Sequence, residues 1–188
     1  MKKQRDRDET FWLVLNAALE LDFRKGHLKW TMSELSRRSG ITRSLVYYHF
    51  GRSKLAILEE AVQVIGEQII GLTPERLEMW RQGDWKKAVL ASRAIIEQSP
   101  SLVNFYLLHR DRPTEIGQHL RKLESNYQQK LEMLFPHLPP AAHGGMFAFF
   151  FGVIFAPAVD ETAIAYALAA LKALTTKPAQ SKSGAVSS

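Results

Sequence analysis

The chain has 188 residues, 46% of them hydrophobic and 23% charged, a balance typical of a globular protein with a packed core. The absence of cysteine excludes disulfides, a thiolate nucleophile and a cysteine-based zinc site. Residues 1–58 hold twelve Lys and Arg and six Asp and Glu, so they carry the whole net charge of +6. Moving the boundary past Glu59 and Glu60 changes the split to +4 and +2 but keeps its direction. A basic N-terminal part on a near-neutral body favours a polyanionic partner.

The first predicted element is an amphipathic helix that Gly26 ends. Its apolar residues recur every three or four positions and therefore share one helical face: Phe11, Val14, Leu15, Ala18 and Leu21. Polar residues interrupt this stretch at Asn16, Glu20 and Asp22, and no small-residue cleavage site follows it. We therefore expect no secretory signal and a cytoplasmic protein.

Two short helices and one long helix come next. Thr31 and Glu34 form a capping-box pattern that starts a helix ending at Ser39-Gly40. Thr42 is predicted to cap a third helix that runs to Tyr48 or His49 before Gly51. A long helix is expected to begin near Ser53, with five apolar residues on one face: Leu58, Ala61, Val62, Ile65 and Ile69.

The remainder also reads as helical, and no alternating strand pattern interrupts it. Turn-forming residues divide it into helices of about 10–20 residues, at 73–74, 83–84, 99–100, 112–113, 136–140 and 157. The sequence thus predicts an all-α protein with three parts. These are a basic N-terminal part at residues 1–58, a helical body at residues 59–175 and a disordered tail at residues 176–188.

Two late segments, 146–158 and 162–174, are strongly apolar. Each is shorter than the roughly 18–20 residues needed to span a bilayer, and Asp160 and Glu161 lie between them, so no membrane association is expected. They are either buried core helices or helices that a second subunit covers.

A helix, a short capped helix, a glycine turn and a short polar-aromatic helix form a helix-turn-helix pattern. In this motif the second short helix enters the DNA major groove and the preceding one crosses the backbone. The segment GITRSLVYYHF at 40–50 combines donors with rings, which suits base edges, phosphates and thymine methyl groups.

Residues 10 to about 62 resemble the DNA-binding domain of TetR-family transcriptional regulators. The resemblance rests on Ala17-Ala18-Leu19-Glu20-Leu21, on Lys25-Gly26, on TMSELSRRSG at 31–40 and on the pattern G-I-T-x-x-x-V-Y-x-H-F that follows. The helical remainder is similar to the family's ligand-binding and dimerising domain in architecture alone. The resemblance implies a helix-turn-helix DNA-binding domain at residues 1–58 and a ligand-binding and dimerisation domain at residues 59–175, with a homodimer formed through residues of about 143–174.

The resemblance implies a set of DNA contacts. Arg43 and Ser44 are the candidates for base edges, and Tyr47 is partly structural with its hydroxyl near phosphate. The complete predicted set is Thr31, Ser33, Thr42, Arg43, Ser44, Leu45, Tyr47, Tyr48, His49, Arg52 and Lys54. Two features depart from the family pattern. The interval from Phe50 to Lys54 is one residue longer, so either Lys54 or Arg52 contacts phosphate, and Leu45 stands where a small hydroxyl residue is common.

In the body we find no serine elbow, phosphate loop or HExxH, and the histidines show no i, i+4 pairing, so no enzyme, cofactor or metal site is expected. Aromatic and polar residues could instead line a pocket for a small hydrophobic effector: Trp80, Phe105, Tyr106, His109, Arg110, Tyr127, Phe147 and Phe151. Tyr106, His109 and Arg110 are the candidates for orienting an anionic or hydrogen-bonding group.

The sequence thus predicts a sequence-specific regulator, a homodimeric repressor that binds a palindromic operator and that a small hydrophobic or aromatic effector releases. An activator of the same fold remains open. So do an all-helical carrier or enzyme without a DNA role and a nonspecific architectural DNA binder, although the apolar body argues against the last.

Overall fold

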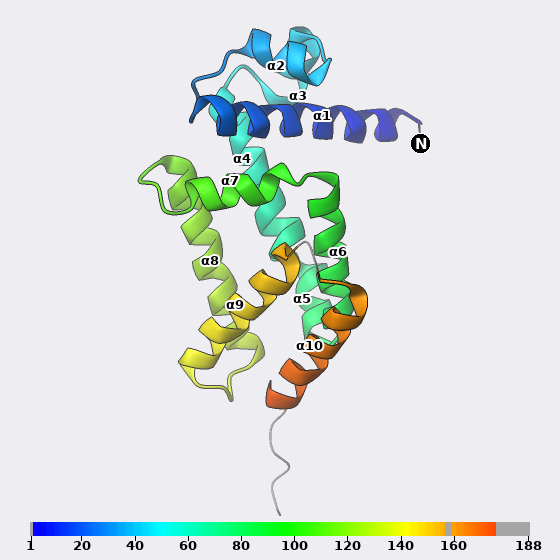
Figure 1. Cartoon of the computed structure of the whole chain (residues 1–188), viewed down its shortest axis with the longest axis vertical. Coiled ribbons are helices and arrows are strands. Elements are labelled where there is room, and N and C mark those ends of the chain that lie inside the picture. The colour runs from blue at the N-terminus through cyan, green and yellow to red at the C-terminus, as the bar shows by residue number, and fades with distance from the viewer. Residues whose placement is uncertain (1, 157–158, 176–188) are drawn as a thin grey trace, which may run out of the picture.

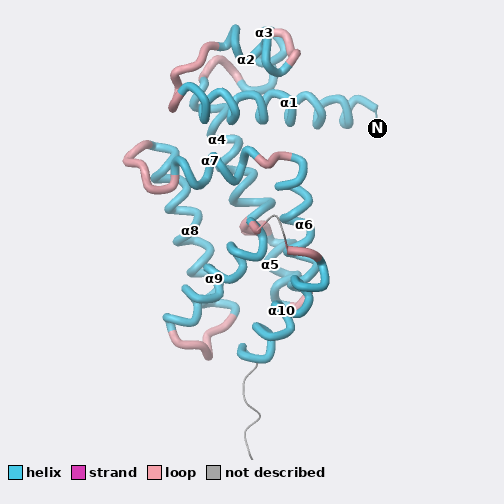
Figure 2. The backbone as a smooth tube through the Cα atoms, in the orientation of Figure 1, coloured by secondary structure: helices cyan, strands magenta, loops and turns pink. Residues whose placement is uncertain are grey.

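The computed structural model describes residues 2–156 and 159–175, so the predicted tail at 176–188 lies outside the described residues. Every regular element in these two ranges is helical, which confirms the all-α prediction (Figure 2). No helix in the described part of the chain is long and apolar enough to cross a membrane.

Three helices form the N-terminal head (Figure 1). They are α1 (Lys2–Lys25), α2 (Met32–Ser39) and α3 (Arg43–Phe50). The predicted capping box is present, because Thr31 Oγ1 accepts from Glu34 N and the Glu34 carboxylate accepts from Thr31 N. Gly40 then ends α2 with φ of 72°, a left-handed conformation that glycine adopts without steric cost.

The head packs around apolar side chains from all three helices. Leu15, Leu35, Val46 and Phe50 are buried, and the Phe50 ring stacks on Phe11 with centroids 5.5 Å apart. Burying these residues fixes α2 and α3 against α1 because each short helix has only one apolar face.

One helix joins the head to the body. Helix α4 (Lys54–Val64) continues into the π-helical turn η1 (Ile65–Ile69), and the expected domain boundary at residue 58 falls inside it. Apolar residues between Ile57 and Ile69 are buried in the core, and this helix runs from the head into the body (Figure 1).

The body consists of α5 (Pro74–Arg81), α6 (Trp85–Gln98), α7 (Ser101–His109), α8 (Glu115–Leu134), α9 (Pro140–Phe155) and α10 (Glu161–Thr175). Their boundaries fall at the predicted turn-forming residues, but α5 and α7 are shorter than the expected range, with 8 and 9 residues. Helix α9 also begins earlier than the apolar segment 146–158, because Pro140 suits a first helical position and the two glycines after it are tolerated.

Helix α7 lies directly under α1 and forms much of the junction between head and body (Figure 1). At this junction Asn16 of α1 donates to the carbonyl of Gln98 at 3.4 Å, and the Ser99 hydroxyl bonds the Asn16 side chain.

Candidate nucleic-acid interface and effector region

The outer face of α3 presents polar and aromatic side chains to solvent. Val46 and Phe50 point into the core, while Arg43, Ser44, Leu45 and Tyr48 are exposed, Tyr48 to 77%. The Thr42 hydroxyl accepts from Leu45 N and caps the helix. A helix N-terminus that carries an arginine and hydroxyls at a basic surface can receive base edges and phosphates.

Residues of α2 complete this surface. Ser33 is exposed, and its hydroxyl lies 3.5 Å from an Arg43 guanidinium nitrogen, so the two helices present adjacent groups. Thr31 is also exposed, although its hydroxyl is engaged in the capping box. His49 is half-buried and its ring lies against Tyr48, with centroids 5.1 Å apart.

The two candidates for the phosphate contact differ clearly in their surroundings. The Lys54 ammonium donates to the carbonyls of Leu28 and Trp30, the latter at 3.0 Å, and lies 5.7 Å from the centre of the Trp30 ring. Arg52 is exposed, and its guanidinium lies 5.5 Å from the centre of the half-buried Tyr47 ring. Lys54 therefore connects the start of α4 to the loop before α2, whereas Arg52 is exposed beside α3.

A buried carboxylate organises the region behind this surface. Asp22 Oδ1 accepts from Leu28 N at 2.8 Å and from Trp30 Nε1 at 2.9 Å, and Asp22 Oδ2 lies 2.9 Å from His109 Nε2. Burial by itself raises the pKa of Asp22, but these hydrogen bonds together lower it to about 2. Sequence reasoning missed this cluster, because nothing local to Asp22 signals a partner 87 positions away.

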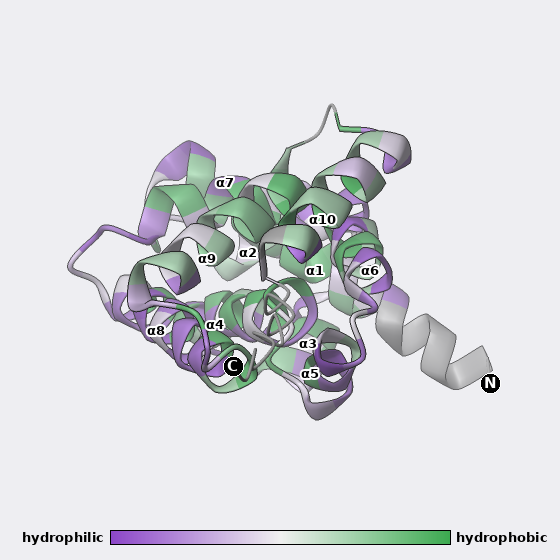
Figure 3. Cartoon of the chain, turned by 90° about the horizontal axis from the view of Figure 1, so that it is seen from below, coloured by the Kyte–Doolittle hydropathy of each residue, from purple (hydrophilic) through white to green (hydrophobic). Residues whose placement is uncertain are grey.

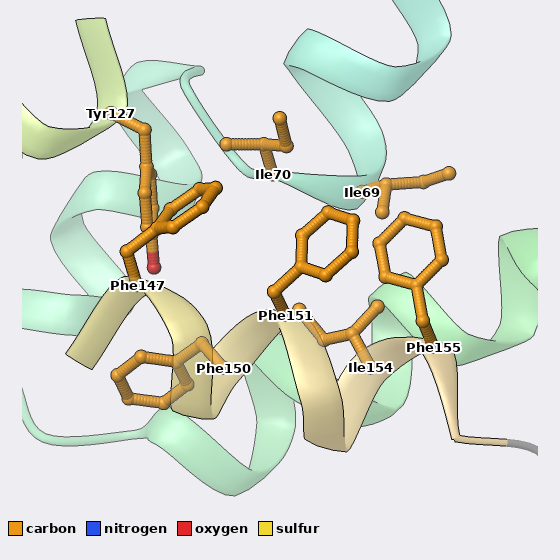
Figure 4. Close-up of a pocket in the computed structure, with 8 residues that line it drawn as sticks. All are labelled: Ile69, Ile70, Tyr127, Phe147, Phe150, Phe151, Ile154 and Phe155. Atoms are coloured by element: carbon orange, nitrogen blue, oxygen red, sulfur yellow. The ribbon is translucent and has the colours of Figure 1, made fainter. Parts of the chain in front are cut away.

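The predicted effector residues do not converge on one pocket. Tyr127, Phe147 and Phe151 line an apolar pocket, together with Ile69, Ile70, Phe150, Ile154 and Phe155 (Figure 4). Its volume of about 10 Å³ is near the space that one water needs. Burial raises the pKa of the Tyr127 hydroxyl above its ordinary value.

The other predicted effector residues have protein partners. Trp80 packs behind the pocket, with its ring 4.1 Å from that of Phe150. His109 is fully buried and faces Asp22 of the head, and Phe105 packs against it with centroids 4.7 Å apart.

Arg110 and Tyr106 share one carboxylate. Arg110 donates to Glu124 through Nε at 2.7 Å and through Nη2 at 2.8 Å, and the Tyr106 hydroxyl also bonds Glu124. The hydrogen bonds with Glu124 raise the pKa of Arg110, while burial and Glu124 raise that of Tyr106. The three side chains therefore satisfy one another, and none presents a free charge to an anionic effector.

A larger groove lies beside the small pocket, where α6, α7 and α9 meet. Its volume is about 410 Å³, within the range of small-molecule sites, and it shares Ile154 and Phe155 with the apolar pocket. Its other lining residues are Arg93, Ile96, Glu97, Pro100, Val103, Asn104 and Ala156. Arg93 is held by the carbonyls of Val153, Ala156 and Val159 at 2.7 to 3.0 Å.

A capped helix-turn-helix head with an exposed arginine on its second short helix, carried on a helical body, defines a DNA-binding protein. Residues 14–61 match the model of the family described as bacterial regulatory proteins, tetR family. The head is therefore a TetR-family DNA-binding domain.

Among solved structures the chain is similar to two of NalD, described as the secondary repressor of the MexAB-OprM multidrug efflux pump in Pseudomonas aeruginosa. Both are 20% identical to it in sequence, with TM-scores of 0.59 and 0.54. Each comparison covers 92% of this chain and 100% of the NalD chain, so the likeness extends over head and body and shows a shared fold. No curated protein matches the sequence.

Proposed function

We propose that this chain is a homodimeric repressor that binds a palindromic operator and that a small hydrophobic or aromatic effector releases. The observation that carries the DNA-binding part is the exposed face of α3, where Arg43, Ser44 and Tyr48 project from a helix anchored by Val46 and Phe50. Two such helices in one dimer would enter successive major grooves about 34–36 Å apart.

Dimerisation is proposed through α9 and α10. Much of both helices is hydrophobic in Figure 3, and Tyr166 is 80% exposed. Several large apolar side chains are only half-buried in the single chain: Phe147, Phe149, Phe151, Val153, Phe155 and Leu171. A second subunit would cover this surface, as it does in many proteins with a large exposed apolar patch.

For the effector, we propose the groove of about 410 Å³ as the entry and the aromatic pocket behind it as the interior. The shared side chains Ile154 and Phe155 would have to move apart, because the pocket has a volume of only about 10 Å³ in this conformation. Helix α7, which lines the groove with Val103 and Asn104, also contacts α1 and would transmit the change to the head.

The test of the DNA-binding role is selection from random duplex DNA at about 150 mM salt, where nonspecific phosphate contacts are weakened. The expected product is an inverted repeat. Arg43→Ala should weaken binding to it by about 1–3 kcal/mol and relax one position of each half-site. Arg37→Ala, an exposed arginine on α2, is the matched control and should retain the sequence preference.

Enrichment of no sequence by a folded dimer would contradict the proposal and favour a helical carrier or enzyme. Equal affinity for every duplex would instead favour a nonspecific architectural binder. A reporter gene under the selected operator separates a repressor from an activator by the sign of the response.

A further inference from the structure

The junction between head and body brings together three side chains that can bind a metal ion. Asp22 lies in the last turn of α1, His27 lies in the following loop, and His109 ends α7. One ligand atom from each lies within 4.8 Å of the other two. Asp22 Oδ2 is 2.9 Å from His109 Nε2 and 3.4 Å from His27 Nδ1.

These separations are close to those that a bound ion requires. Zinc binds imidazole nitrogen and carboxylate oxygen at about 2.0–2.2 Å, which places neighbouring ligand atoms of a tetrahedral site about 3.4 Å apart. The two distances from Asp22 lie near this value, and the two imidazole nitrogens lie within 4.8 Å of each other. The side chains of Asp22 and His109 are buried, whereas that of His27 is 19% exposed and offers a path for the ion.

The surroundings orient the carboxylate. Asp22 Oδ1 accepts from Leu28 N and Trp30 Nε1, which leaves Oδ2 directed at the two histidines. Such outer partners fix a ligating carboxylate and support metal affinity. His109 has the weaker support, because its buried Nδ1 has no hydrogen-bond partner among the described residues.

We propose that Asp22, His27 and His109 form a binding site for a divalent transition-metal ion of the zinc, cobalt and nickel class. Two imidazoles with one carboxylate suit these ions, whereas calcium and magnesium prefer sites made of oxygen alone. Because a histidine ligand without an outer partner typically costs about 10–100-fold in affinity, binding should be weaker than at a site in which both histidines have such partners. The bound ion would link α1 to α7 and so fix the head on the body.

The direct test uses full-length protein without a histidine tag, freed of metal by EDTA, and titrates it with Zn²⁺ by calorimetry and Co²⁺ by visible absorption. About one ion per chain should bind, and saturating Zn²⁺ should raise the unfolding temperature by several degrees, because it binds only the folded state. His27→Gln should weaken binding about tenfold or more, and the fold should remain intact because His27 lies in a loop and is partly exposed.

The matched control is His119→Gln, in the more exposed group Glu59, Glu115 and His119, which also holds its potential ligand atoms within 4.8 Å. This variant should bind Zn²⁺ as the original chain does. Loss of binding in His119→Gln but not in His27→Gln would place the ion on the body surface and overturn the proposal. Failure of the folded original chain to bind Zn²⁺ would show that the junction cluster is a hydrogen-bond network only. Neither result depends on DNA binding, which is measured separately.

Discussion

At the scale of single residues, two neighbouring positive charges have different roles because their contacts differ. Lys54 and Arg52 are two positions apart, yet the first is bonded to two backbone carbonyls and the second is exposed. An ammonium group has three donors, so Lys54 has one left for a phosphate, whereas the Arg52 guanidinium keeps its whole donor set. This difference favours Arg52 as the phosphate contact beside α3.

Substitutions at these two positions should therefore separate binding from stability. Arg52→Ala should lower the slope of log K against log salt by about one per half-site, since one phosphate contact is lost, and leave unfolding unchanged. Lys54→Ala should cost about 1–3 kcal/mol of unfolding free energy, because it leaves the Leu28 and Trp30 carbonyls without their charged donor. Operator titrations at several salt concentrations and urea unfolding measure the two effects. The reverse pattern would assign the phosphate contact to Lys54.

The capping box gives a second prediction, in its dependence on pH. The hydrogen bond from Lys25 and those from Thr31 lower the pKa of Glu34 from 4.5 to about 2. A carboxyl group whose pKa is lowered in the folded state stabilises the fold at every pH above its pKa in the unfolded chain. This contribution is lost as the pH falls through its pKa in the folded protein. The stability difference between the original chain and Glu34→Gln should thus be constant above about pH 5 and shrink between pH 4.5 and 2. Urea unfolding across this range measures it, and a difference independent of pH would contradict the assignment.

At the scale of elements, the turn between α7 and α8 is packed more tightly than its sequence indicates. Gly117 lies in the first turn of α8, where its amide donates to the Thr114 cap at 3.2 Å. A Cβ at this position would lie 2.2 Å from the Arg112 carbonyl oxygen and 2.6 Å from that of His109. Both contacts are with backbone, so a rotamer change cannot relieve them.

Gly117→Ala should therefore destabilise the protein by about 1–3 kcal/mol or more, although alanine favours helix. Gln118→Ala, at the neighbouring exposed position, should change stability by less than about 0.5 kcal/mol. Thermal unfolding of the two variants measures the contrast. If both variants unfold like the original chain, the close approach of α8 to the end of α7 is absent in solution.

At the scale of the whole molecule, the proposed function requires two heads at a fixed spacing. The head meets the body through α4 and through contacts of α1 with α7, while the half-buried apolar residues and the exposed Tyr166 proposed for dimerisation lie on α9 and α10. The separation of these two regions means that a dimer defect and a DNA-contact defect can be distinguished.

Tyr166→Arg should convert the dimer to a monomer and weaken binding to the full operator at least tenfold, because a single head has half of the contacts. The 80% exposure of Tyr166 means that the single chain keeps its fold. Leu107→Arg, on α7 at 63% exposure, is the control and should remain dimeric. Sedimentation equilibrium and operator titration measure both variants. A Tyr166→Arg variant that stays dimeric would move the interface away from this part of α10.

The sequence by itself determined the features that depend on local interactions. Capping residues, glycine turns and helical periodicity act within a few positions, so the all-α fold, the head helices and the exposed face of α3 could be predicted from them. The helix boundaries in the body could be predicted for the same reason, because Pro74, Pro100 and Pro140 restrict the backbone at their own positions.

Only the tertiary structure decided which side chains meet across the chain. His109 was expected in an effector pocket but contacts Asp22, Arg110 is paired with Glu124, and Lys54 bonds the loop before α2. An aromatic or charged residue on a helix has the same local pattern whether it faces a ligand or a distant side chain. The choice is made by the packing of helices remote in sequence, which no local signal encodes.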